Sequence, residues 1–131
     1  MELEKILSNV NYNIEKIVEE LRKRITDIQE INEVIDNNQI FYKYANEDFC
    51  LIKIKKDKLE IDFKSDKTLV DPIDFSWKIR QYRKDTFDRR MQIKNIFDID
   101  TTFEMILQSY KYISTKKIPK QRVDKYARRK A

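Results

Sequence analysis

The spacing of the apolar residues changes along this 131-residue chain, and that change restricts the fold more than any other feature of the sequence. Between residues 40 and 97, apolar and polar residues alternate, as they do in strands with one buried face. From residue 101 to residue 114, apolar residues recur every three or four positions, which is typical of an amphipathic helix. The chain is therefore predicted to form an antiparallel sheet followed by a helix.

The sheet region divides at its turn-forming residues into five predicted strands, at 40–44, 49–55, 59–64, 77–82 and 91–97. The third strand is the clearest, because Leu59, Ile61 and Phe63 alternate with charged residues. Cys50 alternates with Ile52 and Ile54, so we expect it to be a small buried hydrophobic residue and not a nucleophile. Trp77 begins the fourth strand on the same side as Ile79, and we expect it in the core.

Residues 2–35 are predicted to be helical. Their apolar stripe steps by threes and fours along one face: Leu3, Leu7, Val10, Ile14, Ile17, Leu21, Ile25 and Ile28. Two interpretations stay open at this point. The stripe either packs on the sheet, or it forms a coiled-coil dimer or docks on a partner protein through residues 3–28. The polar residues Asn9, Asn11 and Asn13 mark a place where the helix would be split in two.

Together these segments predict an α+β fold, with an antiparallel sheet of about five strands and the N-terminal and C-terminal helices packed on one face. The expected domain covers residues 1–115, with helix at 1–35, sheet at 40–97 and helix at 101–114. Thr101 and Glu104 stand at the spacing of a capping box and predict where the last helix begins. Residues 116–131 are expected to form a basic C-terminal tail.

The composition excludes several classes of function. The chain has no glycine, which excludes P-loops and Rossmann turns, and no histidine, which excludes imidazole bases, Ser-His triads and His-ligated metals. Its single cysteine permits no intramolecular disulfide, so we expect a reducing, cytoplasmic setting. No apolar run approaches the roughly 18 residues that cross a bilayer, and the first ten residues lack the pattern of a secretory signal. We expect no membrane association, no cofactor and no metal.

Three segments carry a resemblance to a known family: IVEELRKRITDIQEIN, IFYKYANEDFCLIKIKKDKLEIDFK and IFDIDTTFEMILQSYKYI. The shared pattern falls on Ile40, Tyr42, Lys43, Asn46, Phe49, Lys55, Lys56, Leu59, Asp98, Asp100 and Tyr110. This pattern resembles the domain of unknown function 5655, found in small proteins labelled "predicted transport protein" and as a C-terminal module of restriction- or defence-associated proteins. The resemblance covers residues 17–113 and implies an α+β fold and an association with nucleic-acid defence systems, without an established chemistry. Family members usually carry glycine between the third and fourth strands, and this chain has none.

The positive charge is concentrated at the C-terminus. Residues 116–131 hold eight basic residues against one acidic residue, whereas the preceding 115 residues hold 20 basic and 22 acidic residues. Clustered lysine and arginine neutralise phosphates and release counterions, and a tyrosine among them can stack on a base. The predicted nucleic-acid-binding residues are Lys116, Lys117, Lys120, Arg122, Lys125, Tyr126, Arg128, Arg129 and Lys130. The alternative interpretation is a solvated terminal tail.

The predicted sheet carries two further groups of charged residues that could act on nucleic acid. Lys53, Lys55, Lys78, Arg80 and Tyr82 would form a cationic platform for single strands if their strands were close, although they also fit the polar side of a half-buried sheet. A magnesium-dependent nuclease would need Asp62 and Lys64 with a second acid, Asp57 or Asp71. Such triplets arise easily in a chain with 39% charged residues. We therefore expect a non-enzymatic module that binds nucleic acid or another polyanion, with a protein-interaction subunit as the alternative and a nuclease third.

Overall fold

The computed structural model describes the backbone of residues 2–80 and 87–126, and the side chains of residues 3–80 and 87–115. Its helices are α1 (Glu2–Leu7), α2 (Tyr12–Thr26), the 3-10 helix η1 (Ile96–Asp98) and α3 (Ile99–Tyr126). Its strands are β1 (Ile31–Asp36), β2 (Gln39–Tyr44), β3 (Glu47–Ile54), β4 (Leu59–Phe63), β5 (Ser76–Lys78) and β6 (Arg89–Ile93).

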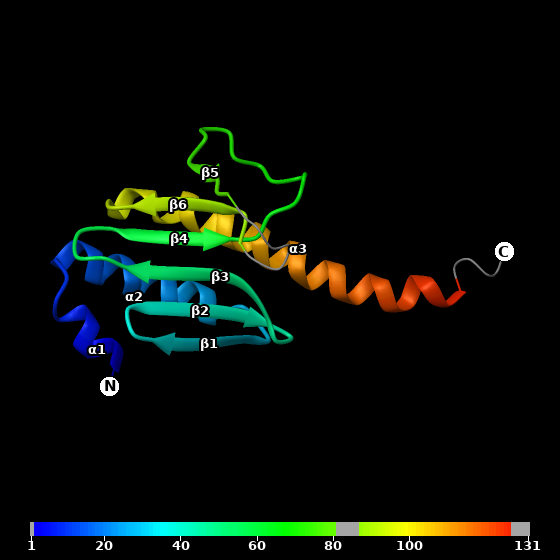
Figure 1. Cartoon of the computed structure of the whole chain (residues 1–131), viewed down its shortest axis with the longest axis horizontal. Coiled ribbons are helices and arrows are strands. Elements are labelled where there is room, and N and C mark those ends of the chain that lie inside the picture. The colour runs from blue at the N-terminus through cyan, green and yellow to red at the C-terminus, as the bar shows by residue number, and fades with distance from the viewer. Residues whose placement is uncertain (1, 81–86, 127–131) are drawn as a thin grey trace.

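The strands form one sheet in the order β1-β2-β3-β4-β6-β5, and every neighbouring pair is antiparallel. Helices α2 and α3 lie behind the sheet in Figure 1, on the same face. The α+β prediction is therefore confirmed, with six strands where about five were expected. We call the opposite side, which no helix of the described residues covers, the outer face.

The core lies between the two long helices and the inner face of the sheet. Helix α2 contributes Ile14, Ile17, Val18, Leu21 and Ile25, none of which retains exposed surface. Leu3 and Leu7 of α1 are also buried, so the apolar stripe of residues 3–28 is used inside the chain. Of the two interpretations of this stripe, packing on the sheet is the one that the structure shows.

The predicted first helix is interrupted where the asparagines stand. Helix α1 ends at Leu7 and α2 begins at Tyr12. Asn11 has an extended backbone, and its side-chain oxygen accepts a hydrogen bond of 2.9 Å from the Ile14 amide. A short polar side chain at this position satisfies an amide that the first turn of a helix leaves unpaired, so it starts a new helix.

The prediction of helix up to residue 35 is wrong for its last part, which forms the edge strand β1. Thr26 ends α2, and Glu30 has a left-handed backbone with φ of 64°, which turns the chain. Ile31 and Ile35 then pair with Tyr44 and Ile40 of β2. The spacing of Ile31 and Ile35 fits both structures: four residues correspond to one turn of a helix and also to the same side of a strand. The sequence pattern alone therefore did not distinguish the two.

The last strand and the last helix also differ from their predicted bounds. Strand β6 ends at Ile93, where a strand to residue 97 was expected, because the Asn95 side chain caps η1 by accepting from the Phe97 amide. Helix α3 starts at Ile99 and not at Thr101, and it continues to Tyr126 instead of ending at 114. The spacing of Thr101 and Glu104 was therefore not a helix start.

Strand β5 is shorter than predicted, and its tryptophan is not in the core. The strand covers Ser76–Lys78, and part of the expected strand 77–82 lies outside the described residues. Its buried residue is Ser76, whereas Trp77 is 43% exposed and lies opposite Arg90 of β6. The prediction that Trp77 lies in the core is therefore wrong.

The turns reach left-handed backbone conformations without glycine. Positive φ angles occur at Glu30, Asn37, Ala45, Asn46 and Asp74. Ala45 and Asn46 form the two-residue connection between the paired residues Tyr44 and Glu47. Two successive positive φ angles match the twist of a hairpin, and glycine or asparagine usually supplies them.

Among residues 2–80 and 87–126, no helix is both long and apolar enough to cross a membrane.

Candidate nucleic-acid interface

Helix α3 carries six of the nine predicted binding residues, and side chains near its middle fix it to the sheet. Ser109 is buried, and its hydroxyl donates a 2.8 Å hydrogen bond to the Phe49 carbonyl and accepts one of 3.2 Å from the Lys64 amide. The Tyr110 ring lies edge-on to Tyr44 and Phe49, with centroid distances of 5.6 and 5.8 Å. These contacts hold α3 against the ends of three neighbouring strands.

The buried stripe of α3 stops shortly after these contacts. Its members are Thr102, Met105, Ile106, Ser109 and Ile113, which follow helical spacing. The next positions of this spacing, 116, 117 and 120, are all lysine, and the next apolar residue on the stripe is Val123. The helix therefore has little apolar surface beyond Ile113 to bury against the sheet. In Figure 1 the C-terminal part of α3 accordingly extends past the end of the sheet.

The structure gives the predicted residues in this segment a helical backbone as far as Tyr126. On that helix lie Lys116, Lys117, Lys120, Arg122, Lys125 and Tyr126. Their side chains, and all of Arg128, Arg129 and Lys130, lie outside the described part of the chain. We call residues 116–126 of α3 the basic extension.

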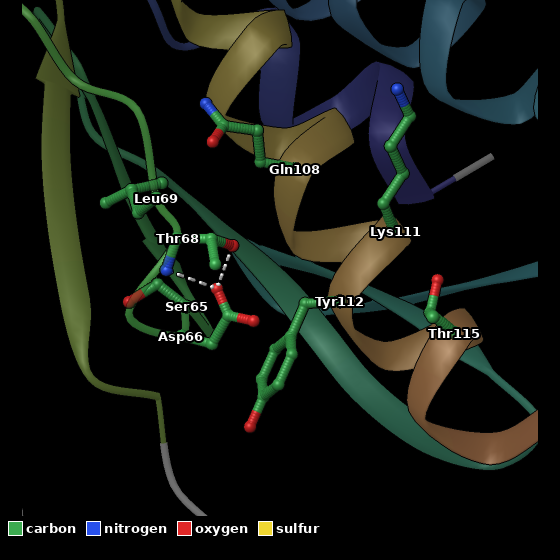
Figure 2. A pocket seen from close by; sticks show the side chains of 8 residues that line it. All are labelled: Ser65, Asp66, Thr68, Leu69, Gln108, Lys111, Tyr112 and Thr115. Carbon is green, nitrogen blue, oxygen red and sulfur yellow. Dashed lines mark hydrogen bonds between the residues drawn. The ribbon is translucent and has the colours of Figure 1, made fainter. Parts of the chain in front are cut away.

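A groove that the sequence did not predict lies beside the start of the basic extension. It has a volume of about 490 Å³ and lies between the loop after β4 and α3 (Figure 2). Its lining residues are Ser65, Asp66, Thr68, Leu69, Gln108, Lys111, Tyr112 and Thr115. Asp66 stiffens the loop, because one carboxylate oxygen accepts bonds of 3.0 and 2.7 Å from the amide and hydroxyl of Thr68. The only sequence signal for the groove was this Asp-x-Thr turn, which is common in loops.

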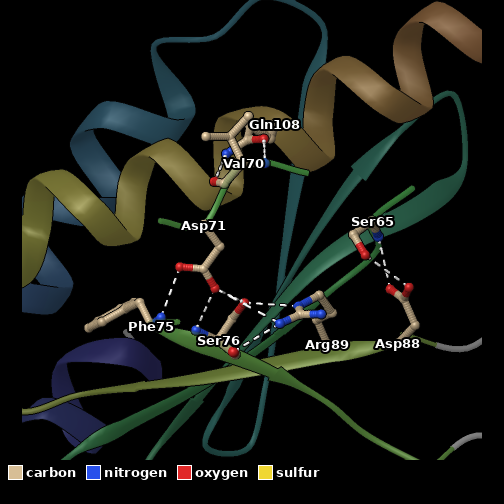
Figure 3. Close-up of polar contacts among 8 residues, drawn as sticks. All are labelled: Ser65, Val70, Asp71, Phe75, Ser76, Asp88, Arg89 and Gln108. Atoms are coloured by element: carbon tan, nitrogen blue, oxygen red, sulfur yellow. Dashed lines mark hydrogen bonds and ion pairs between the residues drawn. The ribbon is translucent and has the colours of Figure 1, made fainter. Parts of the chain in front are cut away.

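Polar side chains hold the long connection between β4 and β5 in place (Figure 3). Gln108 of α3 bonds both the amide and the carbonyl of Val70, at 2.8 and 2.9 Å. Asp71 accepts bonds from the Phe75 amide and from the amide and hydroxyl of Ser76. Burial opposes the charge of Asp71, but these hydrogen bonds and the Arg89 guanidinium hold its pKa below the usual value. These contacts fix the loop in the fold. Asp71 is engaged in them and is therefore not the second acid of a metal site.

The basic residues on the outer face do not form a cationic platform. Lys53 on β3 lies 3.1 Å from Asp62 and 3.7 Å from Glu60, both on β4, so its charge is neutralised. Lys78 lies on the same side of the sheet as Ser76 and Met91 and therefore not on the outer face, and β4 and β6 separate β5 from β3. Lys55 and Arg80 lie beyond the ends of β3 and β5. Tyr82 lies outside the described residues. The polar side of an ordinary sheet is the interpretation that fits these contacts.

Asp62 and Lys64, which were proposed for a nuclease, are each engaged elsewhere. Arg90 donates two bonds, of 2.7 and 3.1 Å, to the two carboxylate oxygens of Asp62, which is 4% exposed. These bonds raise the pKa of the Arg90 guanidinium. Lys64 pairs with Glu47 at 3.2 Å, away from Asp62. No group of three or more acidic or cysteine side chains with the geometry of a metal site occurs among the described residues.

Cys50 is buried among the core residues, as the alternation of β3 predicted. Burial, and secondarily the negative charge of Asp62, raise the pKa of its thiol well above the usual value. A thiol in this state is neither exposed nor ionised, so it does not serve as a nucleophile.

The comparisons with known proteins give one match. A family model described as "Domain of unknown function (DUF5655)" matches residues 3–113. No curated protein and no solved structure matches the chain. The matched region ends at Ile113, which is also the last buried residue of α3 among those described. The basic extension therefore follows directly after the family domain.

Proposed function

This chain belongs to the DUF5655 family, and from that premise we propose that it is a non-enzymatic module that binds nucleic acid through its basic C-terminal segment, residues 116–131. One observation carries the proposal. Residues 116–131 hold eight basic residues against one acidic residue, and the backbone of residues 116–126 leaves the sheet as a continuation of α3 (Figure 1). Clustered cations are suited to a polyanion, because they release condensed counterions when they bind it.

The charges of residues 1–115, which we call the body, also support this proposal, because they are nearly balanced whereas those of residues 116–131 are not. Residues 1–115 hold 20 basic and 22 acidic residues, and many of the cations there are paired within 4 Å of a carboxylate. Such pairs are Arg22–Glu33, Arg24–Asp100, Lys43–Asp48, Lys53–Asp62, Lys64–Glu47, Arg89–Asp71 and Arg90–Asp62. A body with this balance has little long-range attraction for a polyanion, so the affinity must come from the C-terminal segment.

The same proposal places the chain in the cytoplasm, within a nucleic-acid-handling or defence complex. The family resemblance and the single reduced, buried cysteine support that setting. The alternative of a protein-interaction subunit that uses residues 3–28 has lost its main support, because the stripe it needs is inside the core.

The test measures binding to a nucleic-acid probe at a series of salt concentrations. If the segment engages six to eight phosphates, affinity should fall by roughly 10³- to 10⁴-fold between 50 and 200 mM salt. A full-length variant with the eight basic residues of 116–131 changed to Gln should lose this binding and its salt dependence.

A matched control removes the same charge from the body. The exposed residues Lys5, Lys23, Lys55, Lys56, Lys67, Lys78, Lys94 and Lys111 are changed to Gln, which lowers the net charge equally. This control should retain most of the affinity and the salt slope. Equal loss in both variants would show that net charge, and not the C-terminal segment, determines binding, and the proposal would be refuted.

A further inference from the structure

We infer that the basic extension binds as a helix in the major groove of double-stranded DNA. This inference rests on the proposed function and specifies the class of nucleic acid. Its basis is that α3 continues from Ile99 to Tyr126, with Pro119 in its interior, so the predicted tail begins as a helical segment.

The dimensions and charge of the extension fit that groove. Its 11 residues, 116–126, span about 16 Å at 1.5 Å per residue, and the major groove of B-DNA is about 12 Å wide and admits a helix. The segment carries five basic residues against the single Asp124. A helix of this length and charge can lie between the two phosphate backbones and contact both.

The domain holds the extension in a fixed direction. Ser109 and Tyr110 fix the preceding turns to β3 and β2, and Ile113 is buried one turn before the extension begins. A helix that is fixed at one end loses less conformational freedom on binding than a flexible tail, which favours affinity. The extension also stands clear of the sheet in Figure 1, which leaves space for a duplex beside it.

Other classes of nucleic acid fit less well. Single strands are usually bound by aromatic rings on a cationic surface, and the described outer face has its lysine and arginine charges paired with Asp62 and Glu60. Double-stranded RNA has a deep, narrow major groove that side chains cannot read. B-form DNA is therefore the duplex that suits a helical basic segment.

The first experiment changes helicity while it keeps the charge. In the full chain, Val123→Pro places a second proline within the extension, four residues after Pro119, and removes one more backbone hydrogen bond of the helix; Val123→Ala is the matched control. Far-ultraviolet circular dichroism measures the loss of helix. Affinity for a 20-base-pair DNA duplex should fall at least tenfold for Val123→Pro and stay within twofold for Val123→Ala.

The second experiment blocks the groove instead of changing the protein. The wild-type chain is titrated with four probes: the plain duplex, the same duplex with glucosylated 5-hydroxymethylcytosine in its major groove, the corresponding single strand, and an RNA duplex. We expect the plain duplex to bind at least tenfold more tightly than each of the others.

The outcomes separate the inference from the proposed function. Equal affinity for the plain and glucosylated duplexes overturns the inference. So does tighter binding to the single strand or RNA, while the C-terminal segment still serves as the binding element. If the wild-type chain binds none of the four probes, both the inference and the proposed function fail.

Discussion

Removal of the Asp62 carboxylate tests how much the ion pairs of Asp62 with Lys53 and Arg90 on the outer face contribute to the stability of the fold. Asp62 receives two hydrogen bonds from Arg90 and an ion pair from Lys53. In Asp62→Ala both cations lose their closest carboxylate and keep only the longer contacts to Glu60, of 3.7 Å from Lys53 and 3.9 Å from Arg90. We expect the folded state to become less stable without a change in its architecture.

The size of the effect follows from the exposure of the three side chains. Removal of one partner of a fully buried ion pair costs about 3–5 kcal/mol. The side chains of Arg90 and Lys53 remain 28% and 22% exposed, so water recovers part of their solvation. We therefore expect a loss of about 2–3 kcal/mol, a large share of the roughly 5–15 kcal/mol that stabilises a domain.

The assay is urea unfolding, with the slope of the transition compared between variants. Glu104→Ala, at an exposed position on α3, is the control and should change stability by less than about 0.5 kcal/mol. A double-mutant cycle with Arg90→Ala should give a coupling energy of at least about 1 kcal/mol. A loss below about 1 kcal/mol with no coupling would refute the reasoning.

Other predictions concern the core, the thiol and the loop. Leu21→Ala should lower the free energy of unfolding by about 2–5 kcal/mol in urea and leave sedimentation unchanged, since Leu21 is buried within its own chain; a changed oligomeric state at full stability would contradict this. Cys50 should react with a thiol reagent only as fast as the domain opens, and rapid labelling in buffer would contradict its burial. Because the folded-state pKa of Asp71 is lowered, its contribution to stability is present above pH 4 and is lost as the pH falls through the folded value. Asp71→Asn should therefore destabilise the protein at pH 7 more than at pH 3, measured by thermal unfolding, and an equal loss at both would contradict it. Ala45→Gly should raise stability by about 1 kcal/mol in the same measurement, and a loss would show that φ of 50° carries no strain there.

The central strands were predictable from the sequence because their environment is simple. Leu59, Ile61 and Phe63 alternate with charged residues, and β4 has one apolar and one polar side. Strand β1 was missed for the opposite reason. Its inward positions include Glu33, which is accommodated by Arg22 at 2.7 Å and by the Tyr42 hydroxyl at 2.8 Å. Glu33 can face the core because its partners come from other elements of the chain. The local sequence therefore lacks the regular alternation of apolar and polar residues that marks a strand.

The candidate site was predictable in charge but not in shape. The excess of lysine and arginine after residue 115 is visible in the composition, whereas the length of α3 is not. The apolar periodicity ends at Ile113 and a proline stands at position 119, yet lysine, glutamine and arginine favour helix even without a surface to pack on. The groove beside Tyr112 depends on where the β4–β5 loop meets α3, which is a matter of tertiary structure.

A backbone without glycine also affects the unfolded chain. Every residue that carries a Cβ has fewer accessible conformations than glycine, so the unfolded ensemble is narrower than that of an average sequence of this length. Each such replacement at a compatible position is worth about 0.4–1 kcal/mol in favour of the native state. The left-handed turns at Asn37 and Asn46 gain from this restriction, since asparagine tolerates their φ angles. The loops, which are usually the most flexible parts of a domain, therefore lose less conformational entropy when this protein folds than glycine-containing loops would.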